Sequence, residues 1–244
     1  MKGFERAFAP QFVNHLTKVQ QFGKTHGDLE FGQSQDRLRD VLISNEQTPP
    51  VLLGIGNLTQ AAYDTALGFT DFAELAQPGR SIGELLLAEV LIARGEPDGA
   101  AALLVPASAT LERTGYSWGP LSLTYLATAL AQQGEIAESA KILSRAESRH
   151  GTKSALFAPE LAVARAWRLA TIGDQHGAID AARDGARMAE RTGQYAIAVR
   201  AWHEAARLGD VRAADGISKI AAAADCEFTR MAYEHARALA AERQ

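Results

Sequence analysis

The segment GYSWG at residues 115–119 has the spacing GxSxG, which in many hydrolases presents a nucleophilic serine on a sharp strand-to-helix turn. The preceding stretch, ALLVPASATLERT, is typical of a helix, and no series of alternating apolar and polar residues predicts a sheet. We therefore interpret Ser117 as a loop residue ahead of a helix that begins near Pro120. The sequence predicts no catalytic residue and indicates that the protein is not an enzyme.

Two other patterns that could bind a cofactor or a metal lack the residues that would complete them. VLLGIGNLTQ at 51–60 contains GxG, with Asp71 near the position of a ribose-binding acid, but a third glycine and a following parallel strand are missing. None of the six histidines forms HExxH or lies near a pair of cysteines. We expect no cofactor and no metal, and we interpret Cys226 as a small packing residue.

Four Gly-acid steps recur along the chain, and they predict repeated elements. They begin at Gly95, Gly134, Gly173 and Gly209, at intervals of 39, 39 and 36 residues. A period of this size is typical of stacked helix pairs. We expect each glycine to end the first helix of a pair in the left-handed conformation, and each acid to favour the start of the second. Small or apolar residues repeat at fixed offsets before the glycines, as in Ala88, Ala127 and Ala166, and in Leu91, Leu130 and Leu169.

The residues six positions before each glycine vary in chemistry, unlike the small and apolar residues at the offsets above. The row reads Glu89, Thr128, Trp167 and His203, and the offset ten before includes Thr124 and Val163. In a stack of helix pairs the first helices face the concave groove, where a few polar groups among apolar ones can orient a ligand. Arg165 and Arg168 are expected near the same groove or its rim. The predicted ligand-binding residues are Glu89, Thr124, Thr128, Glu160, Val163, Trp167 and His203. In the alternative interpretation, Trp167 belongs to the core and the polar residues are solvated.

These patterns predict an all-α, tetratricopeptide-like solenoid, a right-handed superhelix of antiparallel helix pairs. We divide the chain into diverged helical repeats at 1–80, regular repeats of about 39 residues at 81–225, and a capping helix at 226–244. From residue 81 the expected helices are 81–94, 96–113, 119–133, 135–149, 156–172, 174–192, 194–208, 210–223 and 226–241.

Composition and charge narrow the range of possible partners and cellular locations. The chain of 244 residues is 47% hydrophobic and has a net charge of −4. Lysine and arginine are scattered, so no basic stripe indicates contact with nucleic acid. No apolar run is long enough for a membrane helix, and the charged N-terminus does not fit a secretory signal. With its single cysteine, the sequence favours a cytoplasmic protein.

Several segments of the later repeats resemble one family. They are 115–143, LFAPELAVARAWRLATIGD at 156–174, ERTGQYAIAVRAWHEAARLGD at 190–210, and YEHARALAA at 233–241. They are similar to the helical array of large ATP-dependent LuxR-type transcriptional regulators, which include the maltose-regulon activator. The resemblance implies an array that in this family stands between an ATPase module and a DNA-binding helix-turn-helix. The sequence contains no GxxxxGK[ST] phosphate loop, and it ends about where the helix-turn-helix is expected, so neither ATP binding nor DNA binding is expected of these residues.

The resulting hypothesis is a non-catalytic sensor and protein-interaction array that binds a small-molecule effector or a protein or peptide partner in its concave groove. The alternative is a structural scaffold that mediates oligomerisation without a small-molecule ligand. A homodimer through one end of the solenoid is expected, because a cut array exposes an apolar stacking face.

Overall fold

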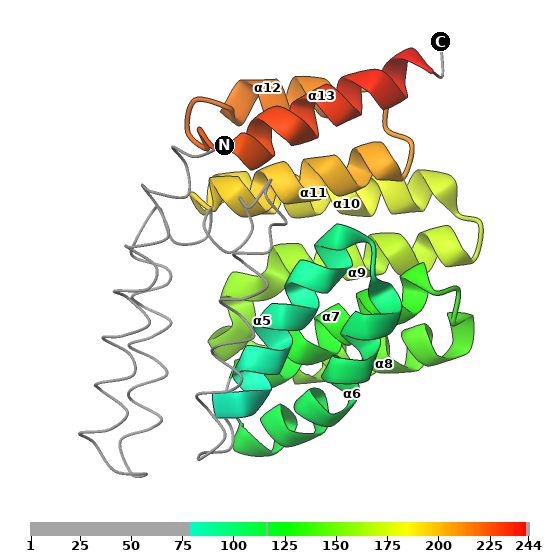
Figure 1. Ribbon diagram of the computed structural model, residues 1–244, viewed down its shortest axis with the longest axis vertical. Helices are drawn as coiled ribbons and strands as arrows, with labels where there is room; N and C mark the ends of the chain where they lie inside the picture. Colours follow the sequence, from blue (N-terminus) through cyan, green and yellow to red (C-terminus); the bar gives the residue numbers. More distant parts are fainter. Residues whose placement is uncertain (1–78, 116, 243–244) are drawn as a thin grey trace.

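The computed structural model describes residues 79–115 and 117–242, and within these ranges it contains α-helices, one 3₁₀ helix and no strand (Figure 1). The predicted diverged repeats at 1–80 fall almost wholly outside this part of the chain. Each predicted helix from residue 81 onward is present, most with ends within one or two residues of those expected. The elements are α5 (Gly79–Arg94), α6 (Pro97–Thr114), α7 (Trp118–Gln132), α8 (Ile136–Arg149), η3 (Thr152–Phe157), α9 (Ala158–Thr171), α10 (Gln175–Arg191), α11 (Tyr195–Arg207), α12 (Ala213–Ile220) and α13 (Glu227–Ala241).

The Gly-acid steps form the turns inside the helix pairs, as predicted. Their glycines have φ angles of 79°, 83°, 82° and 105°, in the left-handed region that a side chain disfavours. After the first glycine, the N–H of Glu96 donates to the carbonyl of Leu91 at 2.9 Å, and the other three steps repeat this bond. It is the long bond of a Schellman motif, which closes the end of a helix. The acid side chain caps the next helix only at the third step, where Asp174 accepts from the N–H of Gly177; Asp210 accepts from the N–H of Arg212, the residue before α12.

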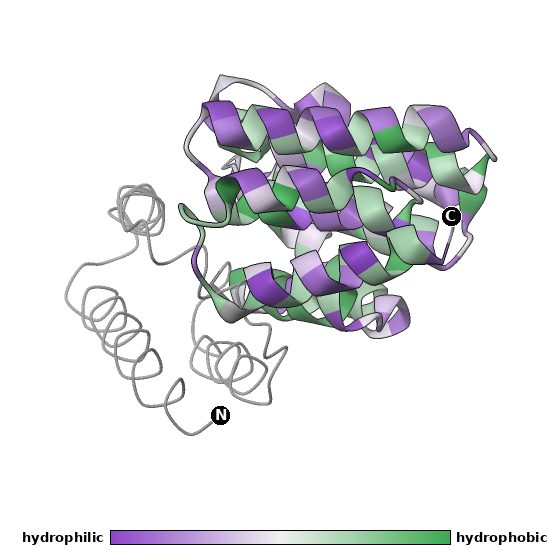
Figure 2. Ribbon diagram, turned by 90° about the horizontal axis from the view of Figure 1, so that it is seen from above, coloured by the Kyte–Doolittle hydropathy of each residue, from purple (hydrophilic) through white to green (hydrophobic). Residues whose placement is uncertain are grey.

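The helices form two layers of antiparallel pairs. The first helices of the pairs, α5, α7, α9 and α11, pack against one another in sequence, and we call them the inner layer. The second helices α6, α8 and α10 each pack against the inner helices on both sides of them in the chain, and α12 and α13 pack together on α11. The helices visible in Figure 2 carry both hydrophobic and hydrophilic residues, as a two-layer arrangement requires.

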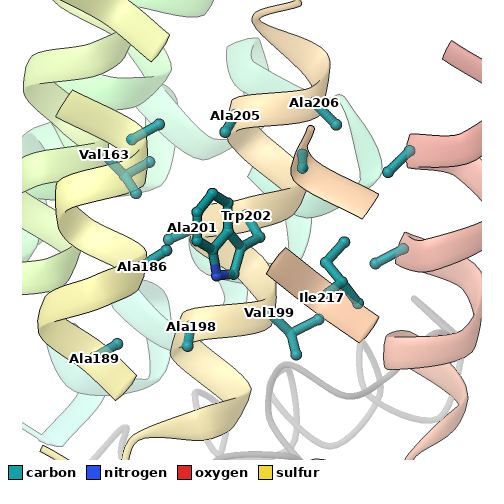
Figure 3. Close-up of a cluster of buried hydrophobic side chains, with 14 of the residues drawn as sticks. Val163, Ala186, Ala189, Ala198, Val199, Ala201, Trp202, Ala205, Ala206 and Ile217 are labelled. Atoms are coloured by element: carbon teal, nitrogen blue, oxygen red, sulfur yellow. The ribbon is translucent and has the colours of Figure 1, made fainter. Parts of the chain in front are cut away.

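Small residues allow the layers to approach closely. Ala127 and Ala166 are 2% and 0% exposed, which agrees with the interpretation of these offsets as packing positions. The last pair has Trp202 at the same offset, and this indole lies among Val163, Ala186 and Ile217 (Figure 3). A methyl group on Gly216 would lie 2.5 Å from atoms of the Trp202 ring. The larger residue therefore fits because a glycine of α12 faces it.

Candidate functional site

A buried ion pair joins the first inner helix to the last. Arg200 on α11 donates from Nη1 to Oε1 of Glu89 on α5 at 2.6 Å, and the two side chains are 10% and 9% exposed. The hydroxyl of Tyr125 on α7 donates to the same oxygen at 2.8 Å, and Arg200 Nη1 lies 3.2 Å from that hydroxyl. The guanidinium also covers the Tyr125 ring, 5.2 Å from its centre. Three of the four inner helices therefore meet in one polar cluster.

Burial and charge together set the protonation of this cluster. Burial raises the pKa of Tyr125 well above its usual value and Glu89 adds to the rise, so the phenol keeps its proton. Burial would lower the pKa of Arg200, but Tyr125 and Glu89 outweigh it and raise that pKa. Arg200 is therefore a permanent cation held between a carboxylate and a phenol.

Glu160 on the fourth inner helix, α9, interacts electrostatically with the same cluster. Its side chain is 8% exposed, and its Oε2 has no hydrogen-bond partner among the described residues. Burial raises the pKa of Glu160 to about 7, against a backbone hydrogen bond and Arg200, which lower it, while Glu89 raises it further. Glu160 is thus a buried carboxyl group with one unpaired acceptor atom, and it interacts electrostatically with Glu89, Tyr125 and Arg200.

A second polar group on the inner layer holds Trp167. Its indole N–H donates to Oε2 of Glu204 at 3.0 Å, and the guanidinium of Arg207 lies 4.9 Å from the centre of the indole. Arg207 also donates to both carboxylate oxygens of Glu204, at 3.0 and 2.9 Å. Burial would raise the pKa of Glu204, but Arg207, His203, Arg200 and the indole together lower it. Trp167 is half-buried against the core, so its orientation is fixed on two sides.

His203 faces the C-terminal helix. Its Nε2 lies 2.7 Å from Nδ1 of His235 on α13, and its ring meets that of Phe228 edge-on at 5.8 Å. Burial lowers the pKa of His203 to about 4; Glu204 opposes this shift, and Arg207, His235 and Arg200 reinforce it. An ordinary environment would let its charge change near pH 6.5. The environment of His203 is not ordinary, because burial keeps the ring neutral at that pH.

The remaining residues of the predicted site contribute packing or local bonds. The hydroxyls of Thr124 and Thr128 are buried and donate to carbonyls of their own helix, at Pro120 and Thr124. Val163 belongs to the hydrophobic core. Arg165 is exposed and forms an ion pair with Glu147 on α8, so it does not point to the polar cluster. Arg168 is half-buried, and its Nη1 has no partner within the described residues.

Sequence reasoning missed Tyr125, Arg200 and Glu204, although one signal was available. Tyr125 and Arg200 both lie nine residues before the glycine of their repeat, where the other two repeats have Leu86 and Ala164. Large polar residues at an otherwise apolar offset are the same kind of signal as the row that contains Glu89. We therefore define the candidate site as the inner cluster of Glu89, Tyr125, Glu160 and Arg200, bordered by Trp167 and Glu204.

The other chemistry-bearing residues lie outside this cluster. Ser117 is buried directly before α7, and the element ahead of it is the helix α6, whereas a nucleophile elbow needs a strand. Cys226 directly precedes α13 and its Sγ lies 3.3 Å from the hydroxyl of Thr229. Over the described ranges, no three His, Cys, Asp or Glu side chains gather as a metal site would need. None of the described helices combines the length and apolarity needed to cross a membrane. The GxG segment and Asp71 lie outside the described residues.

These features define the chain as a tetratricopeptide-like helical-repeat protein. No family model and no curated protein matches its sequence. Two solved structures are similar: a Podosopora anserina protein described as a kinesin light chain with nearly identical TPR-like repeats, and a single-substitution variant of it. Each has a TM-score of 0.41 and 19% identity, and the match covers 83% of this chain and 96% of that chain. Similarity at this level says nothing about the side chains of the inner cluster.

Proposed function

We propose that this chain is the effector-sensing array of a transcriptional regulator of the ATP-dependent LuxR type, and that the effector binds at the inner cluster. One observation carries the proposal: three inner helices join buried polar side chains in one hydrogen-bonded cluster, and Glu160 on the fourth interacts electrostatically with that cluster and leaves a buried acceptor atom unpaired. The resemblance of the later repeats to that family gives the regulatory context.

The unpaired atom favours a ligand because of its energetic cost. Leaving a buried acceptor without a hydrogen bond costs about 1–3 kcal/mol, and more if the group is charged. A packed core of alanine and leucine, as at the other offsets, would avoid that cost. A ligand that donates a hydrogen bond to Glu160 Oε2 would recover this free energy, so the unpaired acceptor favours ligand binding at this position.

Trp167 bounds the proposed site along α9. Glu160, Val163 and Trp167 are spaced at i, i+3 and i+7, so they lie on one face of the helix. The indole is fixed by Glu204 and Arg207, which lets it act as a rigid apolar wall. In this proposal Glu89 and Glu160 are the polar contacts of the effector, and Thr124, Thr128 and Val163 shape the helix faces behind them.

The same cluster offers a way to transmit binding. The Glu89–Arg200 pair connects the first described helix pair to the fourth, so its geometry depends on the curvature of the whole stack. An effector that binds one curvature more tightly than another shifts the population between them by its difference in affinity. In an intact regulator, that shift would change the balance between resting and active assemblies.

A plain scaffold is the rival function, and one observation favours it. Glu89, Tyr125 and Arg200 satisfy one another without any ligand, so they could serve only to fix the curvature. A scaffold that joins copies of itself would associate through an end of the stack. Sedimentation of the full chain as a monomer at high concentration would count against that function.

Native mass spectrometry of the full chain, purified from its own cells, tests the proposal. We expect a small molecule to accompany the protein, to be lost from Glu160→Ala, and to remain on Glu138→Ala, which changes an exposed residue of α8. In the same cells, Glu160→Ala should alter the transcripts of the same set of genes as deletion of the coding region. If the chain always appears at the mass of the protein alone, and deletion of its coding region changes no transcript, the scaffold function replaces the proposed one.

A further inference from the structure

The charges of the inner cluster are not balanced. Glu89 is paired with Arg200, and Glu204 with Arg207, so each of these carboxylates has its own guanidinium. Glu160 has no cation of its own: no ion pair within the described residues includes it, and Arg200 already serves Glu89 and Tyr125. When Glu160 is ionised, the inner cluster therefore carries one buried negative charge in excess.

Glu160 interacts electrostatically with one group on each of the other inner helices, and these groups decide what could balance its charge. Glu89 on α5 and the hydroxyl end of Tyr125 on α7 present oxygen atoms, and Arg200 on α11 presents the cation that they share. A ligand with a carboxylate or phosphate would place another anion beside Glu89 and Glu160, which repels it. A neutral alcohol could donate to Oε2 but would leave the excess charge in place. A cation with an N–H group would satisfy both the open acceptor and the charge.

We infer that the effector of this array is a small organic cation, a primary or secondary ammonium, whose N–H donates to Oε2 of Glu160. The inference rests on the proposed function and adds the chemical class of its ligand. Trp167, on the same face of α9, would contact the apolar part of such a ligand. Its ring is already covered by Arg207 on one side, so the charge of the ligand belongs at Glu160 and not at the indole.

Proton linkage gives this inference a distinctive readout. Glu160, with a pKa of about 7, is about half protonated at pH 7 when the site is empty. A bound ammonium favours the carboxylate, so binding at this pH should release about half a proton per site. From pH 6 to pH 8 the ionised fraction of Glu160 rises about tenfold, and the affinity for an ammonium should rise by about the same factor.

The experiment uses three probes of equal chain length: 1,4-diaminobutane, 1,4-butanediol and succinate, each titrated into the full chain by calorimetry. The diamine should bind, about tenfold more tightly at pH 8 than at pH 6, and the heat should vary with the ionisation enthalpy of the buffer. Glu160→Gln should weaken its binding by more than tenfold and abolish the proton release. Glu138→Gln, at an exposed position of α8, should leave both unchanged.

The outcomes separate this inference from the proposed function. Binding of the diol or succinate but not of the diamine would overturn the cation assignment and leave an effector site in place. Binding of the diamine that survives Glu160→Gln would overturn it as well, because the cation would then lie elsewhere. If no probe or other simple alkylammonium binds, the inference fails; the proposed function fails only if native mass spectrometry also finds no small molecule on the chain.

Discussion

Arg200 on α11 and Glu89 on α5 are 111 residues apart in sequence, and their side chains meet at 2.6 Å with almost no exposure to solvent. Helices α7 and α9 lie between them in the stack, and α7 adds the Tyr125 hydroxyl to the pair. The inner helices therefore converge closely enough for the first and fourth pairs to touch directly.

Removing Arg200 should destabilise the fold more than removing Glu89. Arg200→Met leaves Glu89 as an uncompensated buried charge, which costs about 3–5 kcal/mol, whereas Glu89→Leu leaves Glu160 as a counter-charge for Arg200 and should cost less. The double substitution should cost much less than the sum, because it removes both charges together. Arg187→Met breaks an exposed pair with Asp184 and should cost less than about 1 kcal/mol. Urea denaturation of the four variants checks these values; additive costs would mean that the two charges do not interact.

Glu160→Gln should stabilise the protein at high pH. The pKa of Glu160 is about 7 in the fold and 4.5 in an ordinary environment, so the folded state binds more protons between these values. The parent protein therefore loses stability as the pH rises from 4.5 to 7, and the glutamine variant lacks this loss. At pH 8 the variant should be more stable by up to about 3 kcal/mol, and near pH 4 the two should be similar. Denaturant titrations at both pH values measure the difference, and a constant difference across this range would contradict it.

His203 should make the protein less stable in acid. Its pKa is lowered to about 4 in the fold from 6.5, so the unfolded chain binds its proton first. Stability contributed by the neutral ring is complete above pH 6.5 and is lost as the pH falls towards 4. His203→Gln should flatten this part of the pH profile, and the exposed His176→Gln should not. Between pH 4.5 and 6.5 the stability contributed by Glu160 changes with pH in the opposite direction. Both histidine variants are therefore best compared in a protein that also carries Glu160→Gln.

Gly216→Ala should disturb the packing of α12 on α11. The new methyl group would lie 2.5 Å from the Trp202 ring, so the indole or the helix must shift. Overpacking of this kind costs roughly 1–3 kcal/mol. Gly151→Ala is the control, because its methyl group would meet no atom within 4 Å and its φ is extended. Equal melting temperatures of the two variants would show that α12 does not press on Trp202 as described.

The sequence was sufficient for features that depend on local chemistry. Gly95 and its three equivalents need the left-handed conformation where they stand, so their spacing predicted the turns and the helix pairs. The sequence did not predict the partners of Glu89, because a contact between residues 89 and 200 depends on how each helix pair rotates against the next. The position of Glu89 on an inner helix followed from its repeat offset; its pairing required the curvature of the assembled stack.

The ion pair also bears on how the array unfolds. Repeats that touch only their neighbours behave as a one-dimensional chain, in which ends can fray while the middle stays intact. The ion pair between α5 and α11 couples the unfolding of the first helix pair to that of the fourth. Unfolding of either end then breaks contacts at the other end, so the described helices should unfold as one cooperative unit. An array without such a bond would lose its repeats one after another.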